Sequence, residues 1–534
     1  MVATDPLLIG IDVGTTRVRA LAFTARGGLL AEASRPTPWQ EPAPGLAELD
    51  PEALVDATVA ALAELARRLD RPQRVAGLAV ASVGESGVLL DAADRPLAPA
   101  LAWYDPRPAA LRAELLARVP AELLARIAGV TADPILGVSK LLWHARHTPE
   151  AFEAARRWLH LADWLAFRLG GAPATDATLA SRTGLFDLAR ARWSEELLEA
   201  AGIPSALLPE ILPTGTRIGG LSAPVAAATG LPAGCAIGVA GYDHAMAMLA
   251  ADVLDPSCVL DSMGTAEGLA LPLEAPVLDG RLAACGFNQG LALFDRPLAF
   301  VLTGLATSAA AIDRAHALLA PNASHAALIA AASAVPPGAQ GLLFVPHLRF
   351  PTPPSSLPEA RGLLLGLAPE TDAASVFRAV LEGVALDWQN LLEHVCERIG
   401  RSLPEKIRAV GGSSRNPLLL AIKASLARRP IEAAETPEAV ARGAARAAGR
   451  AARLYPSLEA AGAALRLPFA RIEPDPAWPA DAARRHLARY RALLGLLAPV
   501  QRLLREARTE AGEAGVLLSD RSATDRSGND RPGR

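Results

Sequence analysis

Apolar and polar positions alternate in short runs at the start of the chain. Residues 7–13 form an apolar run that contains Asp12 near its end, residues 18–25 form a second run, and a third begins at Leu29. The segment Gly14-Thr15-Thr16 separates the first two runs. Runs of this length, separated by turn residues, predict a strand, a tight turn and two further strands.

The rest of the chain alternates between helical and strand patterns. Asp50 and Pro51 precede an apolar stripe from Leu54 to Leu69, so a helix is predicted to begin there with Asp50 as its N-cap. The segment 106–199 is predicted to be mostly helical. Strands are predicted near residues 75–81, 88–91, 97–103, 236–240 and 259–263. This succession predicts a mixed α/β fold.

Two Gly-Thr turns end predicted strands, at Gly14-Thr15 and at Gly264-Thr265. Their recurrence about 250 residues apart predicts two duplicated domains that face one cleft. We place the domains at residues 1–246 and 247–500. Beyond about Arg505 the chain becomes polar and charged, so residues 505–534 are predicted to be a disordered tail.

Composition limits the classes of function. With 534 residues, the chain is expected to hold two or three domains, and its formal net charge of −3 provides no basic field for nucleic acid or an anionic membrane. The four cysteines lie far apart, which indicates neither a disulfide framework nor a zinc site and fits a reducing compartment. The apolar stretches are interrupted by Arg, Asp or Pro, so no membrane span is expected and a cytoplasmic protein is predicted.

The first Gly-Thr turn has the chemistry of a phosphate site. Backbone N–H groups and the hydroxyls of Thr15 and Thr16 can contact a phosphate, and Asp12 stands where a carboxylate would hold a Mg²⁺-bound water. A P-loop differs, because its glycines open a helix and a lysine follows. The simpler alternative is an ordinary hairpin turn with no ligand.

Asp243 is the candidate for acid–base chemistry. It lies in Gly241-Tyr242-Asp243-His244, between a predicted strand and a predicted helix. A carboxylate at such a junction, opposite a phosphate loop, can take a proton from a substrate hydroxyl. The alternative is that Asp243 only caps the helix.

Two later turns add candidate nucleotide contacts. Gly264-Thr265 offers a second hydroxyl and N–H cradle for a γ-phosphate. Gly411-Gly412 follows a predicted strand and, with Asn416, precedes a predicted amphipathic helix over 418–426. Glycines at the start of a helix allow a nucleobase or a phosphate to approach the backbone closely.

In combination, these motifs resemble the FGGY carbohydrate kinases, from about Leu7 to about Leu494. That family has an α/β fold of two duplicated ribonuclease-H-like (actin-like ATPase) domains around an interdomain cleft. The resemblance also includes the substrate segment Trp103-Tyr104-Asp105-Pro106-Arg107. Further similar segments lie at 140–143, 361–367, 377–383 and 443–445.

The resemblance implies ATP-dependent phosphorylation of a hydroxyl on a sugar or polyol. Asp243 would be the general base and Asp12 would hold Mg²⁺ through water. The N-terminal domain would bind the sugar and the C-terminal domain would bind ATP. The implied nucleotide contacts are Gly14, Thr15, Thr16, Arg19, Gly264, Thr265, Gly304, Gly411, Gly412 and Asn416.

Substrate contacts are predicted at Glu85, Trp103, Asp105 and Arg107, together with Asp243. The carboxylates of Glu85 and Asp105 would accept hydrogen bonds from vicinal hydroxyls, which favours a neutral ligand such as a ketose of the xylulose type. A fucose-derived ketose, an erythritol-like polyol and gluconate stay as alternatives, the last because of Arg107. Glu85 has the alternative of an exposed hairpin acid, and Trp103 that of a core residue.

The chain departs from the family pattern at Ala266, in the second phosphate motif, and at Ser425 and Ala427, which leave the packing around adenine open. Two rival classes are a non-kinase actin-like ATPase and an inactive sugar-sensing regulator. The first would need neither Asp243 nor the segment 103–107, and the presence of both Asp12 and Asp243 argues against the second. The expected partner is a small-molecule sugar or polyol, and a homodimer stays open.

Overall fold

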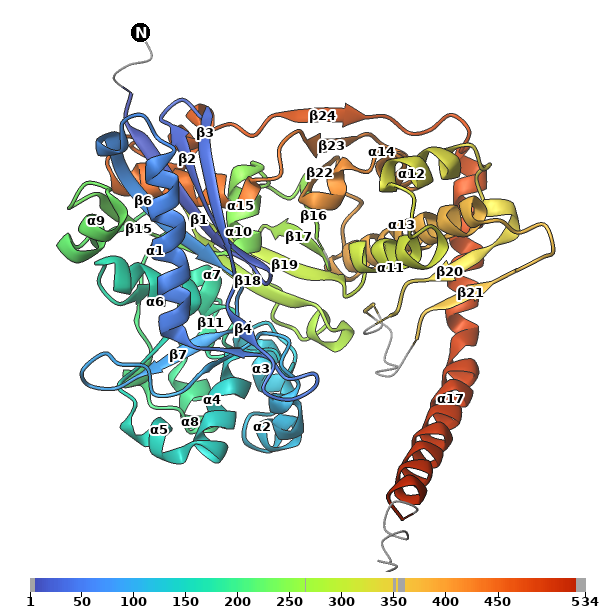
Figure 1. Cartoon of the computed structure of the whole chain (residues 1–534), viewed down its shortest axis with the longest axis horizontal. Helices are drawn as coiled ribbons and strands as arrows, with labels where there is room; N and C mark the ends of the chain where they lie inside the picture. The colour runs from blue at the N-terminus through green and yellow to red at the C-terminus, as the bar shows by residue number, and fades with distance from the viewer. Residues whose placement is uncertain (1–4, 265, 349–351, 354–360, 525–534) are drawn as a thin grey trace, which may run out of the picture.

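Two mixed β-sheets form the centres of the two halves of the chain (Figure 1). The structure is a computed structural model that describes residues 5–264, 266–348, 352–353 and 361–524. The N-terminal sheet has the strand order β14-β15-β6-β1-β2-β3. Its strands are β1 (Leu7–Val13), β2 (Arg17–Thr24), β3 (Leu29–Pro36), β6 (Val75–Ser82), β14 (Arg217–Gly220) and β15 (Ala236–Tyr242).

The C-terminal sheet repeats this spatial order of strands, although its edge strand β24 follows β23 in the chain whereas β14 precedes β15. Its order is β18-β19-β17-β16-β22-β23-β24, so that β16 corresponds to β1 and only β18 is additional. In the N-terminal sheet β1, β2 and β3 are successively antiparallel, and β6 and β15 run parallel to β1. In the C-terminal sheet β16, β17 and β19 are successively antiparallel, and β22 and β23 run parallel to β16. The strands are β16 (Cys258–Met263), β17 (Glu267–Leu273), β18 (Asn288–Leu293), β19 (Pro297–Leu305), β22 (Lys406–Val410), β23 (Ile431–Ala434) and β24 (Phe469–Ile472). The predicted duplication is therefore confirmed.

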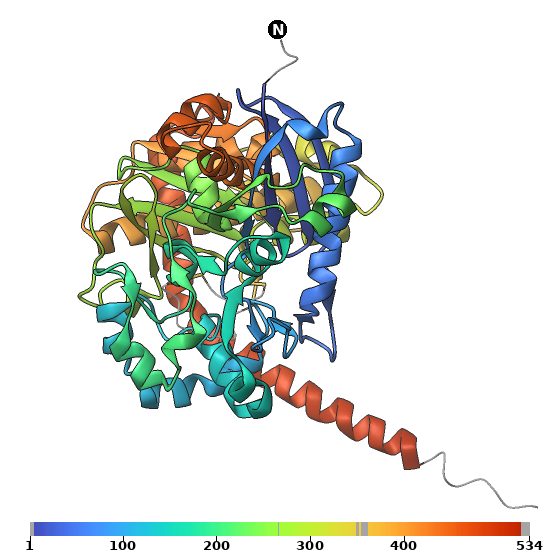
Figure 2. The ribbon, with the colours of Figure 1, turned by 90° about the vertical axis from the view of Figure 1, so that its left-hand side faces the viewer.

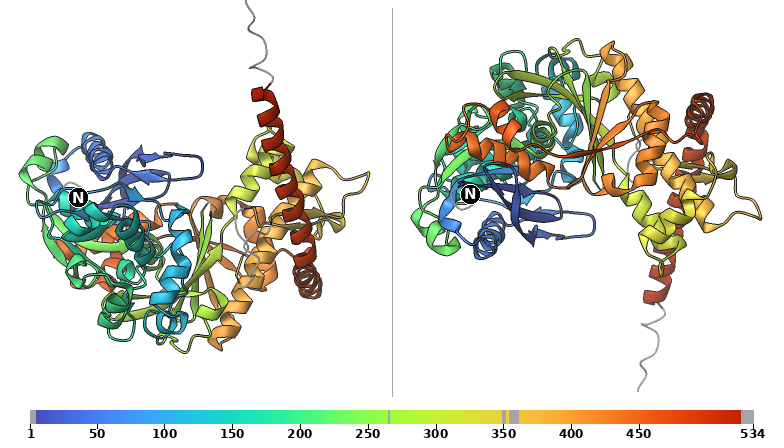
Figure 3. Two further views of the ribbon diagram at one scale, coloured as in Figure 1. Left: turned by 90° about the horizontal axis from the view of Figure 1, so that it is seen from below. Right: turned by 90° about the horizontal axis from the view of Figure 1, so that it is seen from above.

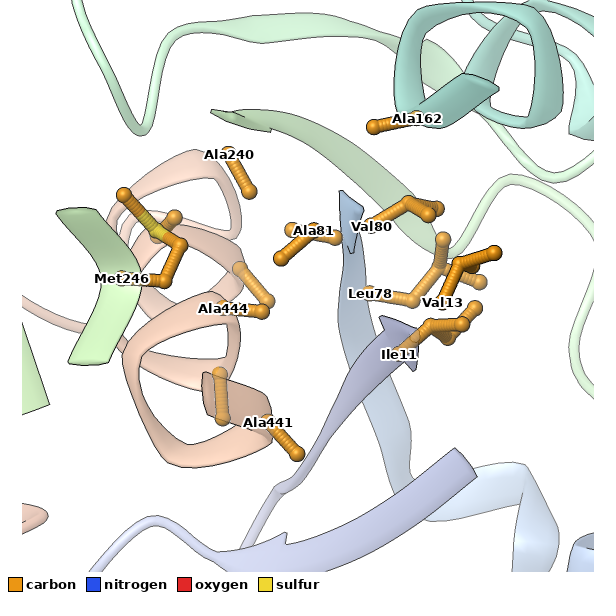
Figure 4. Close-up of a cluster of buried hydrophobic side chains, with 14 of the residues drawn as sticks. Ile11, Val13, Leu78, Val80, Ala81, Ala162, Ala240, Met246, Ala441 and Ala444 are labelled. Carbon is orange, nitrogen blue, oxygen red and sulfur yellow. The ribbon is translucent and has the colours of Figure 1, made fainter. Parts of the chain in front are cut away.

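Two helices form a layer between the sheets. Helix α10 (Asp243–Ala250) leaves the N-terminal sheet, and α15 (Ala439–Ala451) comes from the C-terminal half but packs on β1, β6 and β15. Figure 4 shows Ala441 and Ala444 of α15 beside Met246 of α10, with Ala162 on the other side of the sheet. The approach requires glycine, because a Cβ on Gly10 would lie 1.7 Å from Ala441 O and one on Gly443 would lie 2.1 Å from Met246 O.

Other helices cover the outer faces of the sheets (Figure 3). On the N-terminal sheet these are α1 (Pro51–Arg67) and α6 (Leu161–Leu169), with α9 (Ala223–Thr229) against α1. As predicted, α1 begins after Asp50, whose Oδ1 accepts from Glu52 N at 3.0 Å. The C-terminal half adds α11 (Ala309–Leu319), α12 (His325–Ser333), α13 (Ala373–Ile399), α14 (Pro417–Ala427) and α16 (Leu458–Ala464).

The region predicted to be mostly helical also contains short strands. Besides α6, its α-helices are α2 (Arg112–Arg118), α3 (Ala121–Ile127), α4 (Gly137–His147), α5 (Pro149–Ala154), α7 (Ala177–Ala180) and α8 (Glu195–Ala201). The strand predicted at 97–103 is reduced to β8 (Ala100–Leu101). Short pairs and edges are formed by β4 (Trp39–Gln40), β5 (Glu48–Leu49), β7 (Gly87–Leu90), β9 (Arg157–His160), β10 (Ala174–Thr175), β11 (Phe186–Asp187), β12 (Arg192–Trp193), β13 (Glu210–Ile211), β20 (Leu343–Val345) and β21 (Leu363–Leu365).

The C-terminal segment differs from the prediction of a disordered tail. Helix α17 (Ala480–Thr524) packs on α13 and α14 and then projects away from the body of the molecule (Figure 2). Its backbone is helical over residues 505–524, where the polar composition was interpreted as disorder, and residues 525–534 lie outside the described part of the chain. A polar composition does not by itself prevent a helix that starts on a packed segment.

Candidate active site

Parallel strands bring the two candidate carboxylates to one edge of the N-terminal sheet. Asp12 on β1 and Gly241 on β15 both pair with Ala81 on the intervening strand β6. Asp243 follows Gly241 by two residues at the start of α10. The carboxyl ends of parallel strands are where open α/β sheets commonly bind ligands. Asp12 and Asp243 therefore share one edge, although 230 residues separate them.

The two carboxylates influence each other electrostatically. Burial raises the pKa of Asp12 to about 7, and the nearby charge of Asp243 adds to the rise, while Arg19, its cross-strand partner, opposes it. Burial also raises the pKa of Asp243 to about 7, and Glu85 contributes in the same direction. Both side chains are partly exposed. Two partly desolvated acids of this kind can exchange protons near neutral pH.

The alternative that Asp243 is a helix cap is wrong. Tyr242 occupies the N-cap position of α10, and no capping hydrogen bond from its side chain is present. Asp243 is the first helical residue, and within the described residues its Oδ1 accepts from the adjacent His244 N, at 2.7 Å, and from no other donor. The carboxylate is therefore not committed to closing the helix.

A buried network supports the turn before Asp243. Gly241 has φ +134°, and a Cβ there would lie 2.4 Å from Thr178 Oγ1. Thr178 Oγ1 accepts from Tyr242 N at 2.9 Å and donates to Asp176 Oδ1 at 2.7 Å. Burial raises the pKa of Asp176 to about 7. This network fixes the backbone from which Asp243 projects, and the sequence analysis did not identify it.

The first candidate phosphate loop is a tight hairpin turn. Gly14 N donates to Arg17 O at 3.0 Å, and Gly14 O accepts from Thr37 Oγ1 at 2.8 Å. Thr15 Oγ1 accepts from Trp103 Nε1 at 3.1 Å, while Thr16 is exposed. Trp103 is half-buried, packs against the core and contacts Tyr104 edge-on, so it joins the phosphate loop to the predicted substrate segment.

The second candidate phosphate loop lies beside the other nucleotide candidates. Gly264 is exposed, and its N–H donates to Ala266 O at 3.0 Å; Thr265 lies outside the described residues. A Cβ on Gly411, at φ +96°, would lie 2.7 Å from Met263 O, and one on Gly304 would lie 2.1 Å from Glu267 O. Both glycines thus permit close packing against this loop.

The remaining candidates of the C-terminal half have mixed roles. Gly412 is exposed and has open space at its Cβ position. Asn416 caps α14, since its Oδ1 accepts from Leu419 N at 3.1 Å. Ser425 donates to Ala421 O at 2.7 Å and accepts from Asp475 N at 2.8 Å, so it keeps a polar role at this departure from the family pattern.

The two halves meet next to Asp243. A Cβ on Gly268, in β17, would lie 2.5 Å from Cε1 of the His244 ring. Burial, and to a smaller degree the charge of Arg182, lowers the pKa of His244 to about 4, so the ring is neutral near pH 7. This contact brings the start of α10 against the strand that follows the second phosphate loop.

Glu85 is buried, so the alternative of an exposed hairpin acid is wrong. It has φ +63° and is 4% exposed. Its Oε1 accepts from Arg182 Nε at 2.6 Å, and the guanidinium of Arg182 lies 5.4 Å from the centre of the Tyr242 ring. Arg182 Nη1 is buried and has no hydrogen-bond partner among the described residues. Glu85 and Arg182 therefore form an ion pair in contact with the residue that precedes Asp243.

Asp105 and Arg107 form a closed network. The Asp105 carboxylate accepts from Ala47 N at 2.7 Å and from the backbone N and both Nε and Nη2 of Arg107 at 2.9 Å. Arg107 also donates to Glu48 at 2.8 Å. Burial opposes ionisation of Asp105, but the bonds from Arg107 and Ala47 outweigh it and hold its pKa below the usual value. The prediction that Asp105 accepts bonds from a sugar is not supported, because the protein already uses both oxygens.

Two buried cations were not identified as site residues from the sequence. Arg182 follows a short helix in an apolar region, and Lys423 is the single charged residue between Pro417 and Ala427. The segment 418–426 was interpreted as amphipathic, but α14 is buried on nearly all sides and Lys423 lies in its buried face. A lone cation in an apolar run was the signal, because a buried charge requires a partner.

Family models match most of the chain. The N-terminal domain of the FGGY family of carbohydrate kinases matches residues 7–250, and its C-terminal domain matches residues 272–452. The chain belongs to the FGGY family of carbohydrate kinases. This FGGY kinase is a phosphotransferase enzyme, and kinases of the family use ATP as the phosphate donor. Among the residues that the structure describes, no helix is long and apolar enough to cross a membrane.

Individual relatives agree on the class of enzyme and differ on the substrate. A glycerol kinase from Thermus brockianus is 33% identical over 459 residues, covering 83% of this chain and 89% of the relative. A xylulose kinase from Bacillus subtilis is 27% identical over 457 residues, covering 85% and 89%. The crystal structure of xylulose kinase from Rhodospirillum rubrum matches with a TM-score of 0.82 at 30% identity, covering 93% of this chain and all of that chain. None of these findings favours a non-kinase ATPase or a sugar-sensing regulator.

Proposed function

We propose that this kinase transfers the γ-phosphoryl group of ATP directly to a hydroxyl of a neutral sugar or polyol, with a ketose of the xylulose type as the leading substrate. The observation that carries the proposal is the shared sheet edge of Asp12 and Asp243, next to the contact between the two halves. In-line phosphoryl transfer depends mainly on positioning and on charge stabilisation. The edge of the N-terminal sheet that faces the C-terminal half carries two partly exposed carboxylates, and these can position the reacting groups.

Asp243 is proposed as the general base. Its raised pKa of about 7 leaves a carboxylate that is basic enough to accept a proton from a substrate hydroxyl as the bond to phosphorus forms. Arg182 opposes the rise, so the ion pair with Glu85 adjusts the basicity of this group. The backbone network at Thr178 holds the carboxylate in place.

Asp12 is proposed to hold Mg²⁺ through water. The residues fit, because Asp12 and Asp243 concentrate negative charge at one edge and only Arg19 counteracts it at Asp12. No group of three or more His, Cys, Asp or Glu side chains that could hold a metal exists in the described part of the chain, so a cage made only of protein ligands is not available. Mg²⁺ commonly keeps waters and binds through one or two carboxylates and substrate phosphates, and would neutralise developing phosphate charge here.

The nucleotide is proposed to lie between the two phosphate loops and the Gly411-Gly412 turn. Gly14, Thr15, Thr16 and Arg19 would contact the phosphates from the N-terminal half, and Gly264 and Thr265 from the C-terminal half. Gly412 supports this assignment, because its exposed backbone leaves room for a base. Gly304 and Asn416 would act by shaping the pocket, since the first packs against Glu267 O and the second caps α14.

Three cationic side chains, Arg107, Arg182 and Lys140, are already bonded within the protein, which supports a neutral substrate over gluconate. Arg107 is bonded to Asp105 and Glu48, and Arg182 to Glu85. Burial lowers the pKa of Lys140 to about 8, and its Nζ donates to Ile135 O at 2.7 Å. A carboxylate on the substrate would have to share a cation that already bonds a carboxylate or a carbonyl oxygen of the protein. Glu85 and Trp103 are the proposed substrate contacts, through hydrogen bonding and ring stacking.

Glycerol is a second candidate, because the glycerol kinase from Thermus brockianus has the highest identity among the relatives named above.

The test measures ADP release with Mg²⁺ and ATP against xylulose, fuculose-type ketoses, erythritol, glycerol and gluconate, in the wild type and in Asp243→Ala. Turnover of a neutral compound that Asp243→Ala abolishes would support the proposal. Turnover of gluconate alone, or activity that survives the substitution, would contradict it.

A further inference from the structure

A group of three charged side chains is buried directly beneath the second phosphate loop. Lys423 Nζ, on α14, lies 2.7 Å from Asp261 Oδ2 on β16 and also donates to Glu267 Oε1 on β17. None of these three side chains has measurable solvent exposure. The Trp388 ring of α13 covers the ammonium group, 4.9 Å from the ring centre. We refer to Asp261, Glu267 and Lys423 as the buried ion triad.

The triad joins three segments that carry proposed nucleotide contacts. Glu267 pairs with Met263 across the hairpin that contains Gly264. Glu267 Oε2 also accepts from Ser308 Oγ at 2.6 Å, and Ser308 lies between the end of β19, which holds Gly304, and α11. Lys423 belongs to α14, which begins directly after the Gly411–Asn416 turn. One ammonium group thus links the phosphate loop, the β19–α11 junction and the helix behind the proposed adenosine turn.

Asp261 and Lys423 shift each other's pKa values within the triad. Burial and the charge of Glu267 raise the pKa of Asp261 well above its usual value. Burial alone would lower the pKa of Lys423, but the two carboxyl groups outweigh it and raise that pKa. Two carboxyl groups thus face one ammonium group in a place without solvent exposure.

Stability does not explain why an ion pair occupies this position. Apolar residues of similar volume in place of a buried ion pair often leave a protein equally or more stable, whereas fixed geometry is a recognised use of such pairs. The neighbours of Lys423 in α14 are apolar, so a methionine would suit the environment. Its hydrogen bonds, in contrast, fix the distance between α14 and two strands.

We propose that Lys423 is a positioning residue, which through Glu267 holds the second phosphate loop and the adenosine turn in the geometry that binds the nucleotide. This inference rests on the proposed use of ATP at this site. Two departures from the family pattern lie close to the triad in sequence, Ala266 directly before Glu267 and Ser425 two residues after Lys423. In the part of the chain that the structure describes, no hydrogen bond joins the triad to a proposed sugar contact, so its effect should be confined to the nucleotide.

The test compares the wild type with the triple variant Asp261→Asn/Glu267→Gln/Lys423→Met, which removes the charges while keeping the side-chain volumes. Glu267→Gln alone is a second variant in case the triple variant does not fold. Lys406→Met, at an exposed position on β22, is the matched control. Binding of Mg²⁺-ADP is measured by calorimetry, and KM is measured separately for ATP and for the sugar.

We expect the triple variant to raise the Kd for ADP and the KM for ATP at least about tenfold, with the sugar KM within about twofold of wild type. An unchanged Kd for ADP would overturn the proposal, and so would an equal loss of sugar affinity, because that indicates general loosening of the fold. If the wild type binds ADP but phosphorylates no sugar, the proposed function fails while ADP affinity still decides the role of Lys423. If the wild type binds no nucleotide, both proposals fail.

Discussion

Replacing Asp243 by asparagine removes a proposed base and one of two neighbouring negative charges. The amide keeps the shape of the side chain but cannot accept a proton. Loss of a general base costs about 10²–10⁴-fold in rate, so kcat should fall within that range while the KM for ATP changes little. Because the pKa of Asp243 is about 7, the wild-type rate should itself decline as the pH falls through 7.

The same substitution should stabilise the protein, and only at higher pH. A carboxyl whose pKa is higher in the folded state than in the unfolded state destabilises the fold once the pH exceeds the unfolded value, and the full penalty is reached above the folded value. A shift from 3.8 to about 7 corresponds to at most about 4 kcal/mol, and partial exposure reduces this to about 1–2 kcal/mol. The gain in Asp243→Asn should therefore be present at about pH 8 and absent at about pH 4.

The assay combines ADP release with thermal unfolding at both pH values. Glu122→Gln, an exposed acid-to-amide change on α3, is the matched control and should alter neither. Retention of more than about a tenth of wild-type kcat in Asp243→Asn would refute its role as base. An equal change of melting temperature at both pH values would refute the assigned pKa, since an uncharged effect does not depend on pH.

Three further substitutions test the architecture of the site. Arg182→Met leaves Glu85 buried without its partner and removes a charge that lowers the pKa of Asp243. The acidic limb of the pH–rate profile should therefore move to higher pH, and the sugar KM should rise. An acidic limb at the wild-type pH would contradict the electrostatic link between Arg182 and Asp243. Gly411→Ala places a Cβ 2.7 Å from Met263 O on a backbone with φ +96°, so the KM for ATP should rise about tenfold. The control Gly495→Ala has open space around its Cβ position, and its KM for ATP should equal that of the wild type. Gly10→Ala forces a Cβ to 1.7 Å from Ala441 O and should lower the free energy of unfolding by about 3 kcal/mol or more, measured by denaturant unfolding. An unchanged free energy of unfolding would contradict the close packing of α15 on β1.

The sequence alone determined the local elements and the order of the motifs. The alternation of apolar and polar positions predicted the hairpin that contains Gly14, and the Asp50-Pro51 pair predicted the start of α1. The repeated Gly-Thr turn predicted two related domains, which the matching strand orders confirm. These properties depend on residues that are close in sequence, where backbone sterics and periodicity decide the outcome.

Only the tertiary structure decided which charged side chains are bonded to other groups inside the protein. Asp105 was interpreted as a sugar ligand because carboxylates bind hydroxyls, but its oxygens accept from Arg107 and Ala47. Glu85 was given an exposed alternative, yet it is buried against Arg182, a residue 97 positions away. Lys423 lies far in sequence from Asp261 and Glu267, and no local pattern identifies its partners. The desolvation of a charge and the identity of its partner arise from contacts between distant segments, so they are fixed only when the two sheets and the helices between them are assembled.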